Sequence, residues 1–173
     1  MGSRHVVLAL LAGLTAVGAL LGGCGKEIGD SCTLASDCSP NGDRICQCWN
    51  CTTAGTDQGN GYCTIQGCDY STCPDEAVCV SFFTGGFDNE TCTQDTASTA
   101  CSLDELCSLA GTCVPRSSES RYCMRKCSSD GDCNDGYECR DITLMMQHGG
   151  EPVLAPNTPV DAAHLPKFCA ARP

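Results

Sequence analysis

The stretch Leu20-Leu21-Gly22-Gly23-Cys24 ends an apolar run near the start of the chain. Its last residue matters for the whole protein because the chain contains 19 cysteines, an odd number. If Cys24 takes part in a different chemistry, the 18 cysteines that follow can all pair with one another. The stretch therefore predicts one special cysteine followed by a chain held together by nine disulfide bonds.

The residues before Cys24 have the composition of a secretory signal peptide. Arg4 gives a basic start, and Val6 to Leu21 form a weakly polar to apolar run of 16 residues. A membrane-spanning helix needs about 20 such residues, whereas a signal core has roughly 7–15 and ends in small residues. We expect residues 1–23 to be a signal peptide, with an uncleaved membrane anchor as the alternative. A second apolar run of that length does not follow, which argues against a multi-span membrane protein.

Leu21-Gly22-Gly23-Cys24 resembles the lipobox of bacterial lipoproteins. The resemblance implies that the Cys24 thiol receives a diacylglyceryl group, that a peptidase cuts before Cys24, and that the new amine is acylated. In that family an aspartate after the cysteine favours the inner membrane, so Gly25 implies the outer membrane or the cell surface. Several acyl chains on one residue anchor a protein stably. We expect residues 24–31 to be a lipidated, flexible tether because they are polar and contain Gly25 and Gly29.

The composition of the remaining chain predicts a disulfide-stabilised fold. Residues 24–173 number 150 and carry a net charge of −12, which argues against nucleic acid and anionic lipid surfaces as partners. Only 20 of the 150 are Leu, Ile, Val or Phe, too few to offset the ordering entropy of the chain. Disulfides, at roughly 2–4 kcal/mol each, can replace the missing core. Since they persist in oxidising compartments, we expect a small disulfide-rich, exported fold with little hydrophobic core.

The cysteines after Cys24 fall into four groups of even size. Six of them define a module at residues 32–63, and sets of four define modules at 68–92, 101–123 and 127–169. The opening spacings are similar from group to group, which indicates an internal repeat. We expect pairing within modules, although four cysteines allow three pairings and six allow fifteen. The cysteines are Cys32, Cys38, Cys46, Cys48, Cys51, Cys63, Cys68, Cys73, Cys79, Cys92, Cys101, Cys107, Cys113, Cys123, Cys127, Cys133, Cys139 and Cys169.

The residues between the cysteines predict the local structure of each module. Capping-box spacing at Ser102 and Glu105, followed by leucines, predicts about two helical turns over residues 103–110. Pro74 to Glu76 has the character of a first helical turn. After the third cysteine the pattern becomes strand-like, as in Cys79 to Phe83. We therefore expect tandem repeats of a short helical turn plus a small β-hairpin. An aromatic residue precedes the last cysteine of three groups: Tyr62, Tyr122 and Phe168.

This cysteine layout is similar to that of small secreted modules, namely the Dickkopf N-terminal cysteine-rich region and EB-type modules. It also resembles repeats in cysteine-rich lipoproteins of myxobacteria. The similarity spans most of residues 32–169 and rests on spacing. It implies extracellular recognition modules, and it brings no catalytic residue and no ligand with it.

A long segment interrupts the last module. Between Cys139 and Cys169 lie 29 residues that contain four prolines, and they form a Pro-rich loop at 141–167. Long loops in compact domains are commonly functional or disordered. We expect a solvated excursion with a strand at each end, and a binding loop is the alternative.

Two arrangements of cysteines could carry chemistry other than structural bridging. Cys48 and Cys51 form a C-x-x-C pair, but redox activity requires a thioredoxin-like context that the sequence does not supply. Cys46, Cys48, Cys51 and Cys63 have a spacing compatible with tetrahedral zinc. We expect structural disulfides in both cases, because an oxidising compartment favours pairing.

An acidic turn offers a weak calcium candidate. Asp130, Asp132 and Asn134 alternate as in an EF-hand loop, but the glycine is displaced to position 136 and the loop contains two cysteines. A disulfide-framed calcium site is the hypothesis, and an acidic turn in water is the expected structure. Otherwise we expect no metal or cofactor.

Other candidate residues are few. After residue 23 the chain has two histidines, His148 and His164, both in the Pro-rich loop, where they do not supply the rigid frame that a hydrolase needs. We expect exposed histidines without a catalytic role. Asn50 and Asn89 begin glycosylation sequons, which we attribute to chance in a bacterial protein.

Together these patterns predict a lipid-anchored cell-envelope protein, exported and without catalytic activity. Its modules would act as a binding or structural surface element, with the membrane as one partner and a protein or envelope component as the other. An extracellular protease inhibitor is the alternative, since small stapled scaffolds often display one rigid loop. A thiol–disulfide redox protein using Cys48 and Cys51 is the remote alternative.

Overall fold

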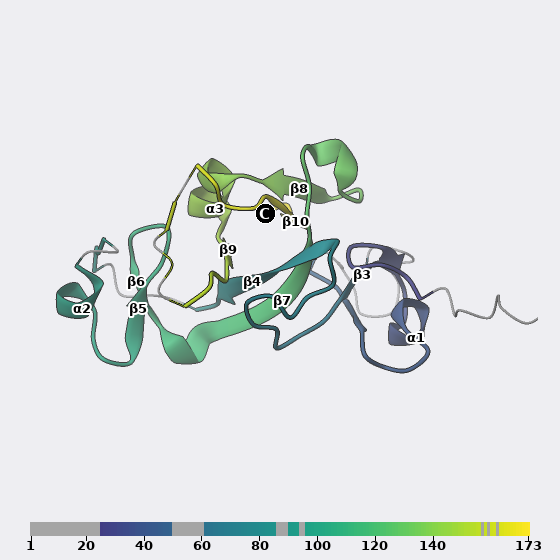
Figure 1. Ribbon diagram of the computed structural model, residues 1–173, viewed down its shortest axis with the longest axis horizontal. Coiled ribbons are helices and arrows are strands. Elements are labelled where there is room, and N and C mark those ends of the chain that lie inside the picture. The colour runs from purple at the N-terminus through teal and green to yellow at the C-terminus, as the bar shows by residue number, and fades with distance from the viewer. Residues whose placement is uncertain are drawn as a thin grey trace, which may run out of the picture.

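The computed structural model describes residues 25–49, 61–85, 90–93, 96–156, 158, 160–161 and 163–173. Within them the chain forms small antiparallel sheets and a few short helices (Figure 1). The strands are β1 (Ser31–Cys32), β2 (Ile45–Gln47), β3 (Gly61–Thr64), β4 (Ala77–Phe83), β5 (Glu105–Cys107), β6 (Cys113–Pro115), β7 (Glu119–Arg125), β8 (Tyr137–Arg140), β9 (Glu151–Pro152) and β10 (Phe168–Ala171). The helices are α1 (Ala35–Cys38), α2 (Ala97–Ala100), α3 (Ile142–His148), η1 (Arg116–Ser118) and η2 (Asp130–Asp132).

The disulfides follow one order along the chain. In each set of four bonded cysteines the first pairs with the third and the second with the fourth. The bridges are Cys32–Cys46 and Cys38–Cys63, Cys68–Cys79 and Cys73–Cys123, Cys92–Cys107 and Cys101–Cys113, and Cys127–Cys139 and Cys133–Cys169.

Two of these bridges differ from the expected modules. Cys73–Cys123 and Cys92–Cys107 both cross the predicted boundary between residues 68–92 and 101–123. The expectation of pairing within those two modules was therefore wrong. One set of cysteines is inserted between the third and fourth members of another, and spacing alone cannot distinguish insertion from succession.

The strand register places the third and fourth cysteines of each set opposite each other. They are register partners in antiparallel pairs β2–β3, β4–β7, β5–β6 and β8–β10, as Cys46 with Cys63, Cys79 with Cys123, Cys107 with Cys113, and Cys139 with Cys169. The first two cysteines of a set bond to these strand residues from the segment that precedes the hairpin, which in the first set contains β1 and α1. Each hairpin is thus held at one point by two bridges.

The turns that precede the hairpins share a backbone hydrogen bond. The carbonyl after the second cysteine accepts the N–H three residues later, at 3.3, 2.9, 3.0 and 2.9 Å for Ser39, Pro74, Ser102 and Asn134. In the first and last sets an aspartate just before the second cysteine, Asp37 or Asp132, accepts two backbone N–H groups that follow the first cysteine. These bonds satisfy donors that a short turn would otherwise leave unpaired.

The helix expected over residues 103–110 does not form. Glu105 Oε2 accepts the Ser102 N–H at 2.9 Å, as the capping spacing predicts, but the chain then enters strand β5. Cys107 instead lies opposite Cys113 in the β5–β6 pair, and each of these two cysteines forms one bridge of this set. The tertiary constraint therefore overrides the local helical signal.

The aromatic residues join the units into one core. Tyr62 is fully buried, and its ring stacks on Tyr137 with centroids 4.9 Å apart and contacts the Trp49 ring edge-on at 5.6 Å. Trp49 in turn meets Tyr122 at 5.2 Å, and the Phe82 and Phe168 rings are 6.3 Å apart. The interior is small but continuous. A count of Leu, Ile, Val and Phe underestimated it because tyrosine, tryptophan and methionine supply much of it.

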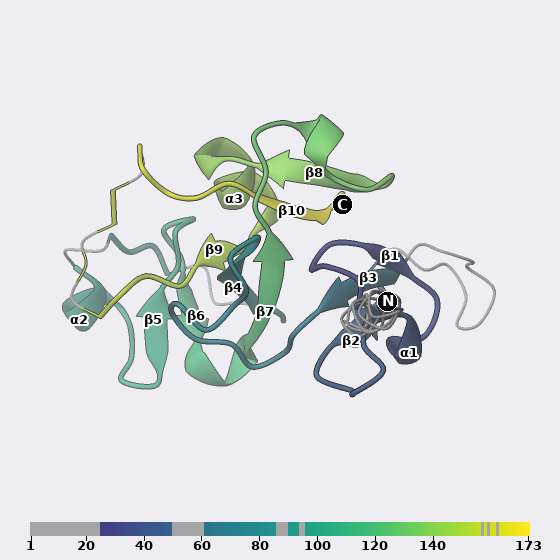
Figure 2. The ribbon, with the colours of Figure 1, turned by 45° about the vertical axis from the view of Figure 1, so that its right-hand side comes forward.

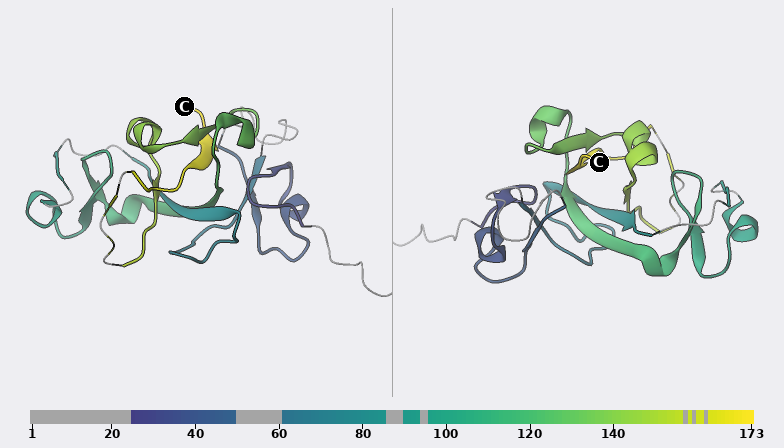
Figure 3. Two further views of the ribbon diagram at one scale, coloured as in Figure 1. Left: turned by 45° about the horizontal axis from the view of Figure 1, so that its top comes forward. Right: turned by 180° about the vertical axis from the view of Figure 1, so that it is seen from behind.

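The inserted set lies to one side of this core and contacts it through Leu109. We call residues 90–115 the lobe and the other described residues the body. The lobe enters the β4–β7 hairpin where Phe83 and Glu119 are register partners. Figures 1 to 3 show β5, β6 and α2 at one end of the molecule and β1, β2 and α1 at the opposite end. The buried cysteines of the lobe, Cys92, Cys107 and Cys113, form a cluster of their own.

Candidate functional site

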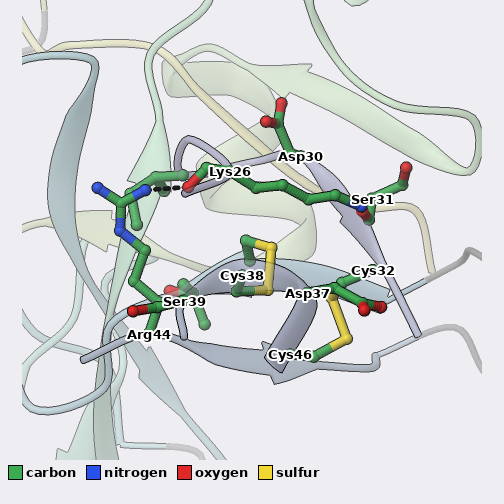
Figure 4. The surroundings of a disulfide bond; sticks show 12 residues. Lys26, Asp30, Ser31, Cys32, Asp37, Cys38, Ser39, Arg44 and Cys46 are labelled. Carbon is green, nitrogen blue, oxygen red and sulfur yellow. Dashed lines mark hydrogen bonds between the residues drawn. A yellow bond between two sulfur atoms is a disulfide. The ribbon is translucent and has the colours of Figure 1, made fainter. Parts of the chain in front are cut away.

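The N-terminal segment is the first candidate site because the predicted lipid attachment residue precedes it. Cys24 lies outside the described residues, and the description begins at Gly25. The Arg44 guanidinium donates to the carbonyl of Lys26, and Lys26 Nζ donates to the Ser31 carbonyl at 2.6 Å (Figure 4). The chain is therefore bonded to the first hairpin from Lys26 onwards.

The next residues are locked into the body. Ile28 is fully buried, and its N–H donates to a Glu76 carboxylate oxygen at 3.3 Å. The Gly29 N–H donates to the Cys63 carbonyl at 2.9 Å, and the Asn134 side chain donates to the Gly29 carbonyl at 2.6 Å. Gly29 has a φ of 96°, and a Cβ there would lie 2.7 Å from the Arg125 side chain, so only glycine fits.

The prediction of a flexible tether over residues 24–31 is therefore wrong for residues 26–31. Composition suggested a tether because Lys26, Glu27 and Asp30 are polar and two glycines are nearby. It gave no sign that Ile28 would fill the shared core. The ion pairs of Arg125 with Asp30 and Glu27, at 3.3 and 3.8 Å, are partly exposed and add about 0–1 kcal/mol each.

The cysteines proposed for redox or zinc chemistry are largely in bridges. Cys46 is bonded to Cys32 and Cys63 to Cys38, so neither offers a thiolate to zinc. Cys48 is also disulfide-bonded, and Cys51 lies outside the described residues. Asn50 and Asn89 of the two sequons lie outside them as well.

The calcium candidates each make hydrogen bonds within the protein. Asp130 accepts the Cys139 N–H at 2.8 Å and pairs with Arg172 at 2.9 Å, while Asp132 accepts two backbone N–H groups. The Asn134 side-chain amide donates to the Gly29 carbonyl. Backbone hydrogen bonds from Ser128 and Ser129 hold the pKa of Asp132 below its usual range. The three side chains thus fix the local backbone.

In the other clusters of potential metal ligands in the described ranges, the cysteine sulfurs are in disulfide bonds. Four of them consist of cysteines that are in disulfides, and the fifth joins Glu90 and Glu105 to Cys113, whose sulfur is bonded to Cys101. These sets therefore provide no free thiolate for a metal ion.

Residues of β8 and of the last turn of α3 form a polar cluster that the sequence did not indicate. Arg140, only 5% exposed, donates to Glu138 at 2.9 Å and to the carbonyls of His148, Gly149 and Ala171. His148 Nδ1 lies 2.7 Å from the same Glu138 oxygen. Burial raises the pKa of Glu138, but hydrogen bonds from His148 and Arg140 outweigh it and leave the pKa below its usual range. The cluster ties the end of α3 to the final strand.

The two histidines therefore differ. Both histidines are exposed, as expected, but the His148 side chain is 27% exposed and is hydrogen-bonded to Glu138 in this cluster. His164 is exposed and pairs with Asp161 at 2.6 Å. A hydrolase would need a nucleophile beside one of them. The described hydrogen bonds of His148 join its Nδ1 to Glu138 and its backbone carbonyl to Arg140.

The segment expected as a Pro-rich loop at 141–167 contains regular structure at its start. Asp141 caps α3 by accepting the N–H groups of Thr143 and Leu144, and Met145 is buried in the core. Strand β9 then pairs with β4, where Glu151 lies opposite Ser81. The segment is therefore tied to the body by a helix and a strand, and Val153 continues the attachment by donating its N–H to the Cys79 carbonyl at 2.8 Å.

A cavity of about 140 Å³ lies where the lobe meets the body. Apolar side chains from both sides line it, including Phe83, Leu109, Val114 and Met145, together with Glu151. Glu151 Oε2 accepts the Leu109 N–H at 2.9 Å, so one hydrogen bond joins β9 to the lobe. Burial raises the pKa of Glu151 to about 7, with Glu119 adding to the effect. A wider hollow borders Gln66 to Asp69 and Glu119 to Arg121.

Comparisons with known proteins identify no relative: neither a protein-family model, nor a curated protein, nor a solved structure matches the chain. Among the described residues, every helix is too short or too polar to cross a membrane. The number of disulfides indicates that the protein folds in an oxidising or extracellular environment.

Proposed function

We propose that the chain is a lipid-anchored protein of the bacterial cell envelope, whose disulfide-bonded body and lobe act as a non-catalytic binding or structural element at the membrane surface. The supporting observation is the state of the cysteines. All those in the described residues are disulfide-bonded, as expected for an exported protein. The odd total in the sequence then favours a separate role for Cys24, which ends the signal-like run.

The repeated architecture is part of this proposal. The four sets of cysteines share the bridge order, the register partners and the turn that follows the second cysteine. We interpret them as copies of one unit, a turn plus a hairpin, of which one copy is inserted into another. Small stapled units of this kind present rigid surfaces at low conformational cost, which suits extracellular recognition.

Attachment through Cys24 is tested by metabolic labelling with an alkyne-bearing fatty acid in bacteria that express the full chain. The wild-type protein should carry the label and partition into the detergent phase of a phase-separating extract. The Cys24→Ser variant should lose the label and move to the aqueous phase. Unchanged labelling and partitioning of the variant would contradict lipidation at Cys24.

The bridges are tested by intact mass. The secreted domain should gain 18 hydrogens on full reduction, which corresponds to the 18 cysteines after Cys24. A smaller gain, with four or more free thiols before reduction, would favour metal or redox chemistry.

Protease inhibition is a second candidate, favoured by one observation. Leu103 is fully exposed on the turn between Cys101 and Cys107, both of which are in bridges. A chymotrypsin-like protease, which accepts large apolar side chains, is the appropriate probe. The secreted domain should inhibit it and Leu103→Asp should not. Cleavage after Leu103 without inhibition would exclude this function.

A further inference from the structure

The chain is fixed to the body almost immediately after Cys24, from Lys26 onwards. Arg44 and Ser31 are both hydrogen-bonded to Lys26, one to its carbonyl and one to its ammonium group, and Ile28 is buried in the core. Gly25 is therefore the single residue between Cys24 and the part of the chain that is fixed to the body. Figure 4 shows Lys26 lying over the first hairpin beside Arg44 and Ser31.

Chain geometry limits how far the body can move from a lipid on Cys24. Two consecutive Cα–Cα steps span at most about 7 Å. A flexible tether of eight residues would instead have an average span of about 16 Å and could adopt many orientations. The distance and the orientation of the body are therefore both restricted by the way in which the chain enters the fold.

The surface around Gly25, where the chain enters the fold, carries an exposed apolar side chain that suits contact with headgroups, but its charges are mixed. Leu34, which precedes α1, is 63% exposed and can lie among headgroups and upper acyl carbons. The nearby charges are mixed, because Lys26 and Arg44 are accompanied by Asp37 and Asp43, whose pKa values are held low by hydrogen bonds. Attraction to anionic lipid therefore contributes little, and the covalent anchor holds the surface in place.

The lobe lies at the other end of the molecule. α1 and β2 occupy one end in Figure 1, β5, β6 and α2 occupy the opposite end, and both views of Figure 3 agree. Leu103, fully exposed, belongs to this far end.

We infer that the surface formed by α1, Leu34 and Lys26 lies directly against phospholipid headgroups, so that the body stands on the membrane and the lobe points away from it. This inference rests on the proposed lipidation of Cys24. It identifies the first unit as the membrane-facing surface and leaves the lobe as the part most accessible to a partner in the surrounding space.

Energy transfer in vesicles tests this orientation. Lipidated full-length protein, purified in detergent, is reconstituted into phosphatidylcholine–phosphatidylglycerol vesicles that contain a headgroup-labelled acceptor lipid. An azide-bearing amino acid replaces Leu34 in one variant and Leu103 in another, and each carries the same donor dye, since a new cysteine could disturb the bridges. Transfer from position 34 should exceed transfer from position 103 at least twofold, both in 0.1 M and in 1 M salt.

A linker insertion provides the matched control. Twelve Gly-Ser residues inserted between Cys24 and Gly25 should keep the protein on floated vesicles but reduce the difference between positions 34 and 103 to less than about 1.3-fold. The same residues added after Pro173 should leave the difference unchanged.

The possible failures are distinguishable by vesicle flotation. Equal transfer from the two positions in protein that floats with the vesicles would overturn the inferred orientation while leaving lipidation intact. Protein that does not float would overturn both the lipid anchor and the orientation.

Discussion

The body and the lobe are stabilised in different ways although they share the same bridge order. In the body, disulfides fix individual hairpins, and buried aromatic residues such as Tyr62, Tyr137 and Phe168 pack those hairpins against one another. In the lobe, the buried cluster consists of three cysteines with small alanine side chains beside them. The disulfides therefore form the buried cluster of the lobe, to which the buried Val114 adds, whereas in the body they support a core made mainly by other residues.

The comparison teaches that one type of unit can be used in two ways. In the lobe, a turn and hairpin with two bridges meets the body through few contacts, among them Leu109 and the Glu151 hydrogen bond. The same unit becomes part of a larger interior when its strands carry aromatic residues next to the cysteines, as Tyr62 and Phe168 do. Removing bridges should therefore affect the lobe most, and removing aromatic rings should affect the body most.

Removal of both lobe bridges should have the largest effect. Their closed loops of 15 and 12 residues contribute about 3 kcal/mol each. With Cys92, Cys101, Cys107 and Cys113 replaced by alanine, hydrogen exchange should show that amides of residues 105–115 lose their protection while those of β4 and β7 keep it. Protection retained in the lobe, or lost throughout the body, would contradict the separation of the two regions.

Tyr62→Ala should have the next largest effect, on the body. It removes a fully buried ring that contacts Trp49 and Tyr137, and a loss of about 3–5 kcal/mol in the free energy of unfolding is expected. Denaturant unfolding without reductant measures this loss. Lobe amides should keep their local protection.

Tyr62→Phe is the matched variant, because it keeps the ring. It removes the hydroxyl oxygen that accepts the Arg125 N–H at 2.8 Å, and should cost about 1–2 kcal/mol. If the two variants were equally destabilised, the hydroxyl and not the ring packing would be the main contribution of Tyr62.

Glu151→Gln tests the joint between the two regions. Burial raises the pKa of Glu151 to about 7, above its unfolded value near 4.5, so its stabilising contribution is complete below pH 4.5 and is lost as the pH rises through 7. Glutamine can still accept the Leu109 N–H without a charge. The variant should match wild type at pH 4.5 and exceed it by about 3 kcal/mol at pH 8 in denaturant unfolding. A difference between the two proteins that does not change with pH would show that Glu151 does not cause the loss of stability at high pH.

Leu103→Ser should have the smallest effect on stability. The side chain is fully exposed, so the free energy of unfolding should change by less than about 0.5 kcal/mol. A larger loss would mean that Leu103 packs against the fold, and it would weaken the view of the lobe as an exposed tip.

The sequence predicted the class of the fold because composition determines it: many cysteines and few large aliphatic residues leave a disulfide-rich chain as the stable solution. It also predicted strand β4, but the first helical turn expected at Pro74 to Glu76 was wrong, because a non-helical turn there leads directly into β4. It could not predict that Cys73 pairs with Cys123, because an inserted unit and a following unit have the same spacing. Nor could it predict that Ile28 is buried, because Ile28 contacts residues that are distant in sequence. The cluster of Arg140, Glu138 and His148 was also not predictable, because it forms only when α3 packs beside β8.

The interleaved order of the bridges also determines how the protein responds to proteolysis. Because each pair of bridges overlaps, the bonds between described cysteines span every peptide bond in residues 32–63, 68–123 and 127–169. A protease that nicks the chain in any of these ranges leaves both fragments covalently joined. Of the two connections that those bridges do not span, one contains the fully buried Thr64 and the other the buried Met124. A chain bridged in this way can be cut in its exposed turns and still remain a single molecule.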